Sequence, residues 1–224
     1  MTTSIQQTEV LAKLSPAQKG ALTKLIKKNN QLYKQANRRE RKVLILKDAL
    51  NVLKADKLFE LRGGSYLVSD ETVNINQSSL LTTSDKVCSV CARGALFLSK
   101  IRLNNKINIE YSPLYENFKP VDASSQTIPH PSTDGFAEIL KDAFTESELS
   151  LIEACFEQSS GFLSDEVGTY IYSLPKYLKH PDMLSTIIKD TFPGTPEERF
   201  KKIASIIIKA NGDVIKPLIK AILP

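Results

Sequence analysis

The sequence predicts an α+β protein that is mainly helical, and three observations support this fold class. Long stretches repeat apolar residues three and four positions apart, the spacing of an amphipathic helix. Shorter stretches in the N-terminal half alternate apolar and polar residues beside a Gly-Gly pair, as strands joined by a tight turn do. A proline-rich stretch then separates this half from a second helical one. We therefore expect N-terminal helices with a small antiparallel sheet, followed by a helical C-terminal portion.

Two helical patterns come first. The run Ser15-Pro16-Ala17-Gln18 predicts a helix start, because serine and the glutamine three residues later can form a capping box and proline fits the first turn. A second pattern covers about residues 39–57 and repeats apolar residues at Val43, Leu46, Leu50 and Leu53. The sequence leaves open whether the two patterns form one long helix or a hairpin broken near Asn37.

The apolar period then changes to that of strands. Residues 58–61 and 65–68 flank Gly63 and Gly64, so we expect them to form a β-hairpin. Residues 73–76 predict a third strand, and residues 106–111 return to strand-like alternation. Between these two stretches, Ser84 and Asp85 predict the start of a helix that runs to about residue 103.

Prolines divide the chain. Residues 112–133 contain Pro113, Pro120, Pro129 and Pro131, and proline biases its preceding residue away from helix. We therefore expect an α+β portion at 1–111, a linker at 112–133 and a helical portion at 134–224. In the last portion, capping sequences at 145–148 and 195–198 predict helix starts, and Asn211-Gly212 predicts a left-handed helix end. Residues 218–223 predict a short apolar tail that docks onto the rest.

Composition places the chain among ordinary globular proteins, with 42% hydrophobic and 25% charged residues. No apolar run approaches the roughly 20 residues that a membrane-spanning helix needs, so we expect no membrane partner. The first residues have neither the basic nor the apolar region of a secretion signal. Three cysteines, an odd number, indicate free thiols in a reducing compartment. Cytoplasmic localisation is the expectation.

The motif Cys88-Ser-Val-Cys91 has three interpretations. If both thiols lie on the predicted helix at 84–103, they share a face with Ala92 and Ala95 and pack in the core. Thiol chemistry near a helix start and a metal site are the alternatives. Cys155, His130 and His180 are the other available ligands, but no second close ligand pair exists, and Cys155 fits an apolar helix face. We expect core packing, with no metal and no cofactor.

Catalytic signatures are absent from the sequence. It has no Gly-x-Ser-x-Gly motif, and the Gly63-Gly64 pair joins predicted strands instead of opening a phosphate-binding helix. The adjacent acids at 165–166 and 197–198 fit helix capping. We therefore assign no catalytic residue, and an enzyme with a site assembled from scattered residues remains an alternative.

The distribution of charge gives the main functional hypothesis. The first sixty residues hold thirteen Lys and Arg against five Asp and Glu, a net charge of +8, whereas the whole chain carries +5. The candidate binding residues are Lys24, Lys27, Lys28, Lys34, Arg38, Arg39, Arg41 and Lys42. Such a surface can contact an acidic protein or nucleic acid, or can simply be solvated. Tyr33 is the one aromatic residue among them, so an acidic protein partner leads and sequence-nonspecific nucleic-acid binding follows. The sequence does not predict an oligomeric state.

The stretch 47–101 resembles a loose group of uncharacterised phage and bacterial proteins. Its Lys47-Asp48-Ala49-Leu50 run, the Gly63-Gly64 pair and Cys88-x-x-Cys91-Ala92-x-Gly94-Ala95-Leu96 match their K-D-A-L helix, glycine hairpin and cysteine-bearing helix. Many of that group have a further cysteine after the helical motif, where this chain has Phe97 and Leu98. The resemblance implies a phage or mobile-element origin, hence host cytoplasm or virion as further locations. It implies no activity, so no functional residue is transferred.

Overall fold

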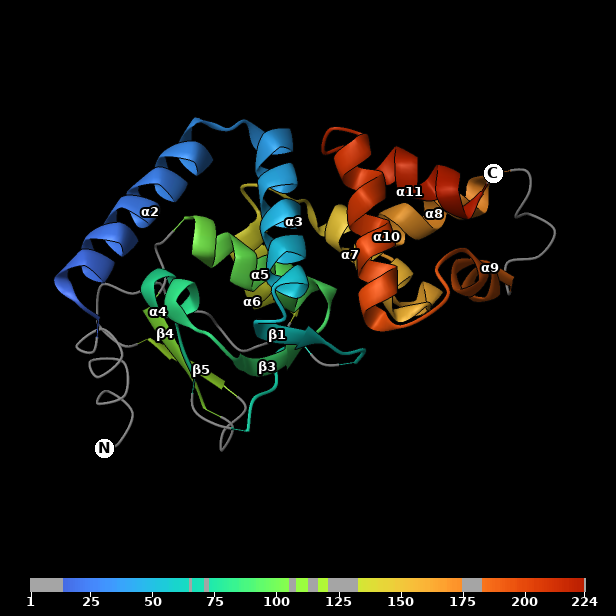
Figure 1. The fold of residues 1–224 in the computed structure, drawn as a ribbon. Helices are drawn as coiled ribbons and strands as arrows, with labels where there is room; N and C mark the ends of the chain where they lie inside the picture. The colour runs from blue at the N-terminus through green and yellow to red at the C-terminus, as the bar shows by residue number, and fades with distance from the viewer. Residues whose placement is uncertain are drawn as a thin grey trace.

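The computed structural model describes residues 14–64, 66–70, 73–104, 108–112, 117–120, 133–174 and 183–223. Within these ranges the protein is mainly helical, as predicted (Figure 1). The α-helices are α2 (Pro16–Gln35), α3 (Arg38–Lys54), α4 (Gln77–Thr82), α5 (Ala92–Leu103), α6 (Thr133–Leu140), α7 (Glu146–Glu157), α8 (Asp165–Ser173), α9 (Leu184–Thr191), α10 (Pro196–Lys209) and α11 (Ile215–Ile222). The other elements are a 3-10 helix, η1 (Ser160–Phe162), and the strands β1 (Leu58–Leu61), β2 (Val73–Asn76), β3 (Lys86–Val90), β4 (Asn108–Ser112) and β5 (Asn117–Pro120).

The helix starts follow local capping. Ser15 forms the predicted capping box with Gln18, and Thr145 and Thr195 form boxes with the glutamates three residues later. The open question near Asn37 is also answered: Ala36 is extended, and Asn37 caps a separate helix α3 through a box with Glu40. α2 and α3 are therefore two helices joined by a sharp turn.

The hairpin predicted at 58–68 is wrong. β1 pairs in parallel with β3, so the two segments beside Gly63 and Gly64 are not partners of each other. Val68 instead forms an isolated antiparallel bridge with Ser89, on β3. The two segments that the sequence predicts to be hairpin partners, 58–61 and 65–68, therefore each contact β3 instead. Gly64 does adopt the expected positive φ of 73°, but its turn carries the chain past β3 instead of back along β1.

The prediction of a helix that starts at Ser84 is wrong for the residues before α5. Residues Lys86–Val90 form β3, where Val87 and Val90 suit a pleated strand, and α5 begins only after Cys91. A second sheet has the order β2-β4-β5, with antiparallel pairing at both interfaces. Its strands β2 and β4 occupy stretches that the sequence predicts as extended.

α5 lies at the centre of the core. Its contacts reach α3, α4, α6 and α7, as well as β1 and β3. In Figure 1, α2 lies at one edge of the molecule, and α3 stands between it and the C-terminal helices α10 and α11. One cluster of buried side chains runs from Tyr33 to Ile222. Most of the predicted linker lies outside the described residues, so the division into domains stays a prediction, while the described parts of both portions share this core.

The C-terminal portion is helical, as predicted. α10 ends at a left-handed turn, with φ of 50° at Asn211 and 82° at Gly212. A side chain at Gly212 would collide with the backbone of Arg39, so this turn packs directly against the start of α3. The predicted apolar tail belongs to α11, whose Leu218 and Ile222 are buried.

Candidate partner-binding surface

α2 is a cationic helix with little buried surface. It contains five lysines and no acidic residue, so no ion pair can form within it. Tyr33 is its one buried residue. Asn29 helps to attach the same side of the helix by donating a hydrogen bond to the carbonyl oxygen of Arg102, at 3.2 Å. One side of α2 is therefore fixed to the core, and the rest of its circumference is open.

Four of the eight predicted cations form what we call the cationic face: Lys24, Lys27, Lys28 and Lys34. At about 100° per residue these four positions fall within an arc of about 120°. All four are exposed, and none has an ion-pair partner among the described residues. Like charges three and four positions apart destabilise a helix by about 0.2–0.5 kcal/mol per pair. Charge interactions within α2 therefore do not favour lysine at these positions.

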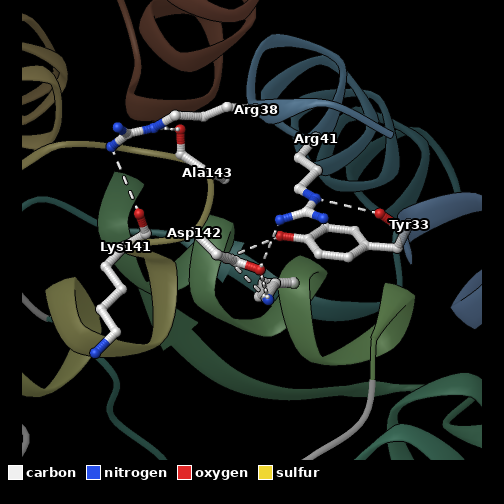
Figure 2. Close-up of polar contacts among 7 residues, drawn as sticks. Tyr33, Arg38, Arg41, Lys141, Asp142 and Ala143 are labelled. Carbon is white, nitrogen blue, oxygen red and sulfur yellow. Dashed lines mark hydrogen bonds and ion pairs between the residues drawn. The ribbon is translucent and has the colours of Figure 1, made fainter. Parts of the chain in front are cut away.

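Arg38 and Arg41 bind within the molecule instead (Figure 2). Arg38 donates from Nε to the carbonyl oxygen of Ala143, at 3.1 Å. Arg41 donates from Nε to the carbonyl oxygen of Tyr33, at 3.2 Å, and its Nη1 lies 3.6 Å from the Asp142 carboxylate. Both side chains thus tie the α2–α3 turn to the segment after α6.

Asp142 is the centre of that contact. Its carboxylate accepts hydrogen bonds from the Tyr33 hydroxyl at 3.0 Å and from Lys100 Nζ at 2.8 Å. The ammonium of Lys100 also lies 4.3 Å from the centroid of the Tyr33 ring. Burial, and next the negative charge of Asp142, raise the pKa of Tyr33 above its ordinary value. The tyrosine is therefore a neutral hydrogen-bond donor that attaches α2 to Asp142 in the segment after α6.

Lys42 is a core residue. Its side chain is 6% exposed and forms an ion pair with Glu148 on α7. Arg39, by contrast, is exposed at the start of α3, with its backbone against the Gly212 turn. Of the eight predicted binding residues, the structure brings the four lysines of the cationic face together, leaves Arg38 and Arg39 exposed, half-buries Arg41 and buries Lys42.

An apolar groove lies beside the cationic face, and the sequence reasoning missed it. We call it the α2–α3 groove; its volume is about 350 Å³, and it is lined by Leu32, Gln35, Ala36, Glu40, Val43, Leu44 and Asn211. Leu25 and Leu32, 41% and 45% exposed, lie on the same side of α2, two turns apart. A helical-wheel projection places this pair about 60–120° around the helix axis from Leu22, Ile26 and Tyr33. That projection is the signal that could have found it.

Buried cations elsewhere are matched by carboxylates. Arg102 Nε lies 2.9 Å from Asp48, and burial raises the pKa of Asp48 while the guanidinium of Arg102 opposes that rise. Arg93 on α5 pairs with Glu146 at 2.8 Å and with Glu153 at 3.8 Å, both on α7. Glu153 is 2% exposed, and this burial raises its pKa to about 7. These pairs join helices to one another.

The cysteines are packing residues in the structure. Cys88 lies on β3 and Cys91 is the residue before α5, so the prediction that they share one helix face is wrong. Burial raises the pKa of the Cys88 thiol to about 12 and that of Cys91 well above its ordinary value. Cys155 is fully buried on α7, as predicted. Thiols held neutral in this way are poor nucleophiles and poor metal ligands.

The described residues include no group of three or more His, Cys, Asp or Glu side chains arranged to hold a metal ion. His130 and His180 lie outside the described residues. Among the helices that the structure describes, none has both the length and the apolar character to cross a membrane.

Comparisons with known proteins add no assignment. No protein-family model, no curated protein and no solved structure matches this chain. The resemblance of residues 47–101 to phage and bacterial proteins therefore stays a prediction, and the case for function depends on the surface described above.

Proposed function

We propose that this protein is a non-enzymatic accessory protein that binds an acidic protein partner through the cationic face of α2. The observation that carries the proposal is that α2 holds five lysines and no acid, while its cationic face has no ion-pair partner among the described residues. Four exposed positive charges on one arc attract an anionic surface and guide its approach.

Two features favour an acidic protein over nucleic acid. Proteins that bind single-stranded nucleic acid without sequence preference stack bases on exposed aromatic rings. Tyr33, the one aromatic residue among the cations, is 1% exposed and its hydroxyl is bound to Asp142, so it offers no ring to a base. The exposed leucines beside the lysines supply an apolar contact that a phosphate backbone does not require.

The test compares two charge reversals of equal size. The first variant carries Lys24→Glu, Lys27→Glu, Lys28→Glu and Lys34→Glu. The control reverses four exposed lysines on the C-terminal helices: Lys189, Lys209, Lys216 and Lys220. Both variants have the same net charge, so any difference between them reports the position of the charge.

Binding of a labelled poly-glutamate peptide and of labelled DNA and RNA is then measured at low and moderate salt. We expect the peptide to bind the wild type and the control, and to bind the α2 variant at least about tenfold more weakly. Equal loss in both variants, or no peptide binding by the wild type even at low salt, contradicts the proposal. If the wild type binds DNA or RNA more tightly than the peptide, and only the α2 variant loses this binding, the cationic face is a nucleic-acid-binding surface instead.

A further inference from the structure

Apolar surface and positive charge lie side by side on α2. In helical projection, Lys28 lies about 40–60° and Lys24 about 80–100° from the Leu25–Leu32 stripe. The two leucines are seven residues apart, so the stripe runs about 10 Å along the helix. They are 41% and 45% exposed. Tyr33 is the one buried residue of α2, so these two leucines are not needed to fill the core.

α3 supplies the opposite wall. Val43 and Leu44 are half-buried, and together with Leu32 and Ala36 they give the α2–α3 groove its apolar lining. Figure 1 shows the two helices diverging from their shared turn. The Gly212 turn packs on Arg39 at the start of α3, and the adjacent Asn211 lines the groove. A mainly apolar groove between two helices is the kind of site that accepts the apolar face of a third helix.

The charges around the groove define that third helix. One acid, Glu40, lines the groove, but its carboxylate accepts a hydrogen bond from the Asn37 backbone N–H at 2.8 Å and caps α3. Two exposed cations are close to the lining in the sequence: Arg39 precedes Glu40 on α3, and Lys28 lies one helical turn before Leu32 on α2. A helix with an apolar stripe flanked by acidic residues matches both properties, whereas a basic or neutral helix leaves the lysines unmatched.

We infer that the α2–α3 groove is the docking site for an acidic amphipathic helix of a partner protein. This inference rests on the proposed function and adds the form of the partner to it. The leucine stripe and the α3 wall bind the apolar face, and Lys24 and Lys28 bind the flanking carboxylates. Apolar contacts at the centre with charges at the rim are the usual anatomy of a protein interface.

The experiment uses two peptides of identical composition. The first is an acidic peptide with leucines at positions i, i+3, i+4 and i+7, so that they form one helical stripe. The second is a scrambled isomer in which no stripe forms. Affinities are measured for the wild type, for a Leu32→Ser/Val43→Ser groove variant, and for a Val68→Ser control that removes an exposed valine next to β3.

We expect the wild type and the control to bind the striped peptide about tenfold or more tightly than the scrambled one. The groove variant loses this preference and keeps its affinity for the scrambled peptide, while the four-lysine reversal weakens both. Equal binding of the two peptides by the wild type, or an unchanged preference in the groove variant, overturns the groove inference and leaves the proposed function standing. If neither peptide binds, both fail. If the wild type is a dimer and the groove variant is a monomer, the groove binds a second copy of the chain, and this result also overturns the inference.

Discussion

α5 and α2 carry similar cations in opposite surroundings. Eleven of the twelve residues of α5 are buried, whereas α2 buries one of its twenty. The three cations of α5 each meet a carboxylate: Arg93 meets Glu146 and Glu153, Lys100 meets Asp142, and Arg102 meets Asp48. The lysines of the cationic face meet none among the described residues. The comparison teaches that a basic residue of this protein is a candidate for binding a partner only when no carboxylate of the fold already pairs with its charge.

The largest expected difference between the two helices concerns their glycines. A Cβ at Gly94 of α5 would lie 2.0 Å from the carbonyl oxygen of Tyr66, so Gly94→Ala forces the backbone apart. We expect it to cost about 3 kcal/mol or more in the free energy of unfolding. Gly20 of α2 has nothing within 4 Å, and Gly20→Ala should stabilise the helix by about 0.5–1 kcal/mol. Urea unfolding measures both, and a Gly94→Ala protein as stable as wild type would refute the close packing of α5.

Next in size is the loss of the Arg102–Asp48 ion pair, whose side chains are 18% and 14% exposed. Arg102→Met leaves Asp48 buried without its cation and should cost about 3 kcal/mol, whereas Lys28→Met should change the free energy of unfolding by less than about 0.5 kcal/mol. The double variant Arg102→Met/Asp48→Leu should recover part of the loss, because it removes the stranded charge. Similar costs for Arg102→Met and Lys28→Met would show that the two helices do not differ as described.

Glu153 makes the α5–α7 interface sensitive to pH. Its pKa is about 7 in the folded protein, above the ordinary value of 4.5. Between these two pH values the folded protein keeps a proton on Glu153 that the unfolded protein has lost. The stabilisation is fully present below about pH 4.5 and is lost as the pH rises to about 7. Relative to Glu153→Gln, the wild type should lose about 2–3 kcal/mol between pH 5 and pH 8. Parallel stability curves for the two proteins would show that Glu153 is not protonated by its burial.

The smallest effect is expected on α2. Changing the four lysines of the cationic face to glutamine removes repulsion between neighbours such as Lys24 and Lys28 and breaks no ion pair among the described residues. The variant should unfold at the same or a slightly higher temperature, with a gain of about 0.5 kcal/mol. A loss above about 1 kcal/mol would mean that these lysines serve the fold, and the functional proposal would lose its main support.

Local features of the fold could be predicted from the sequence, and non-local ones could not. The capping boxes at Ser15, Thr145 and Thr195 depend on residues three positions apart, so reading the sequence finds them. The parallel pairing of β1 with β3 depends on segments almost thirty residues apart, and the sequence offered the nearer Gly-Gly turn instead. The same limit applies to Cys91, which ends up before α5 because the preceding residues pair as a strand.

The candidate site shows this limit in its cations. Lys28 and Lys42 look alike in the sequence, but Lys42 meets a glutamate 106 positions away and becomes a core residue. Arg41 is likewise engaged by Asp142. The groove is a different case, because it depends on Leu32, which with Leu25 is rotated about the axis of α2 away from the buried Tyr33. The angular positions of Leu25 and Leu32 around α2 can be calculated from the sequence. The acidic partners of Lys42 and Arg41 are distant in the sequence and cannot be.

Hydrogen–deuterium exchange with and without the striped acidic peptide tests the central claim most directly, because it locates the contact without any substitution. We predict added protection in residues 20–44, which include the cationic face and both walls of the α2–α3 groove, with α9 and α11 unchanged. Protection confined to the C-terminal helices, or spread evenly over the protein, would contradict the assignment of α2 as the binding surface.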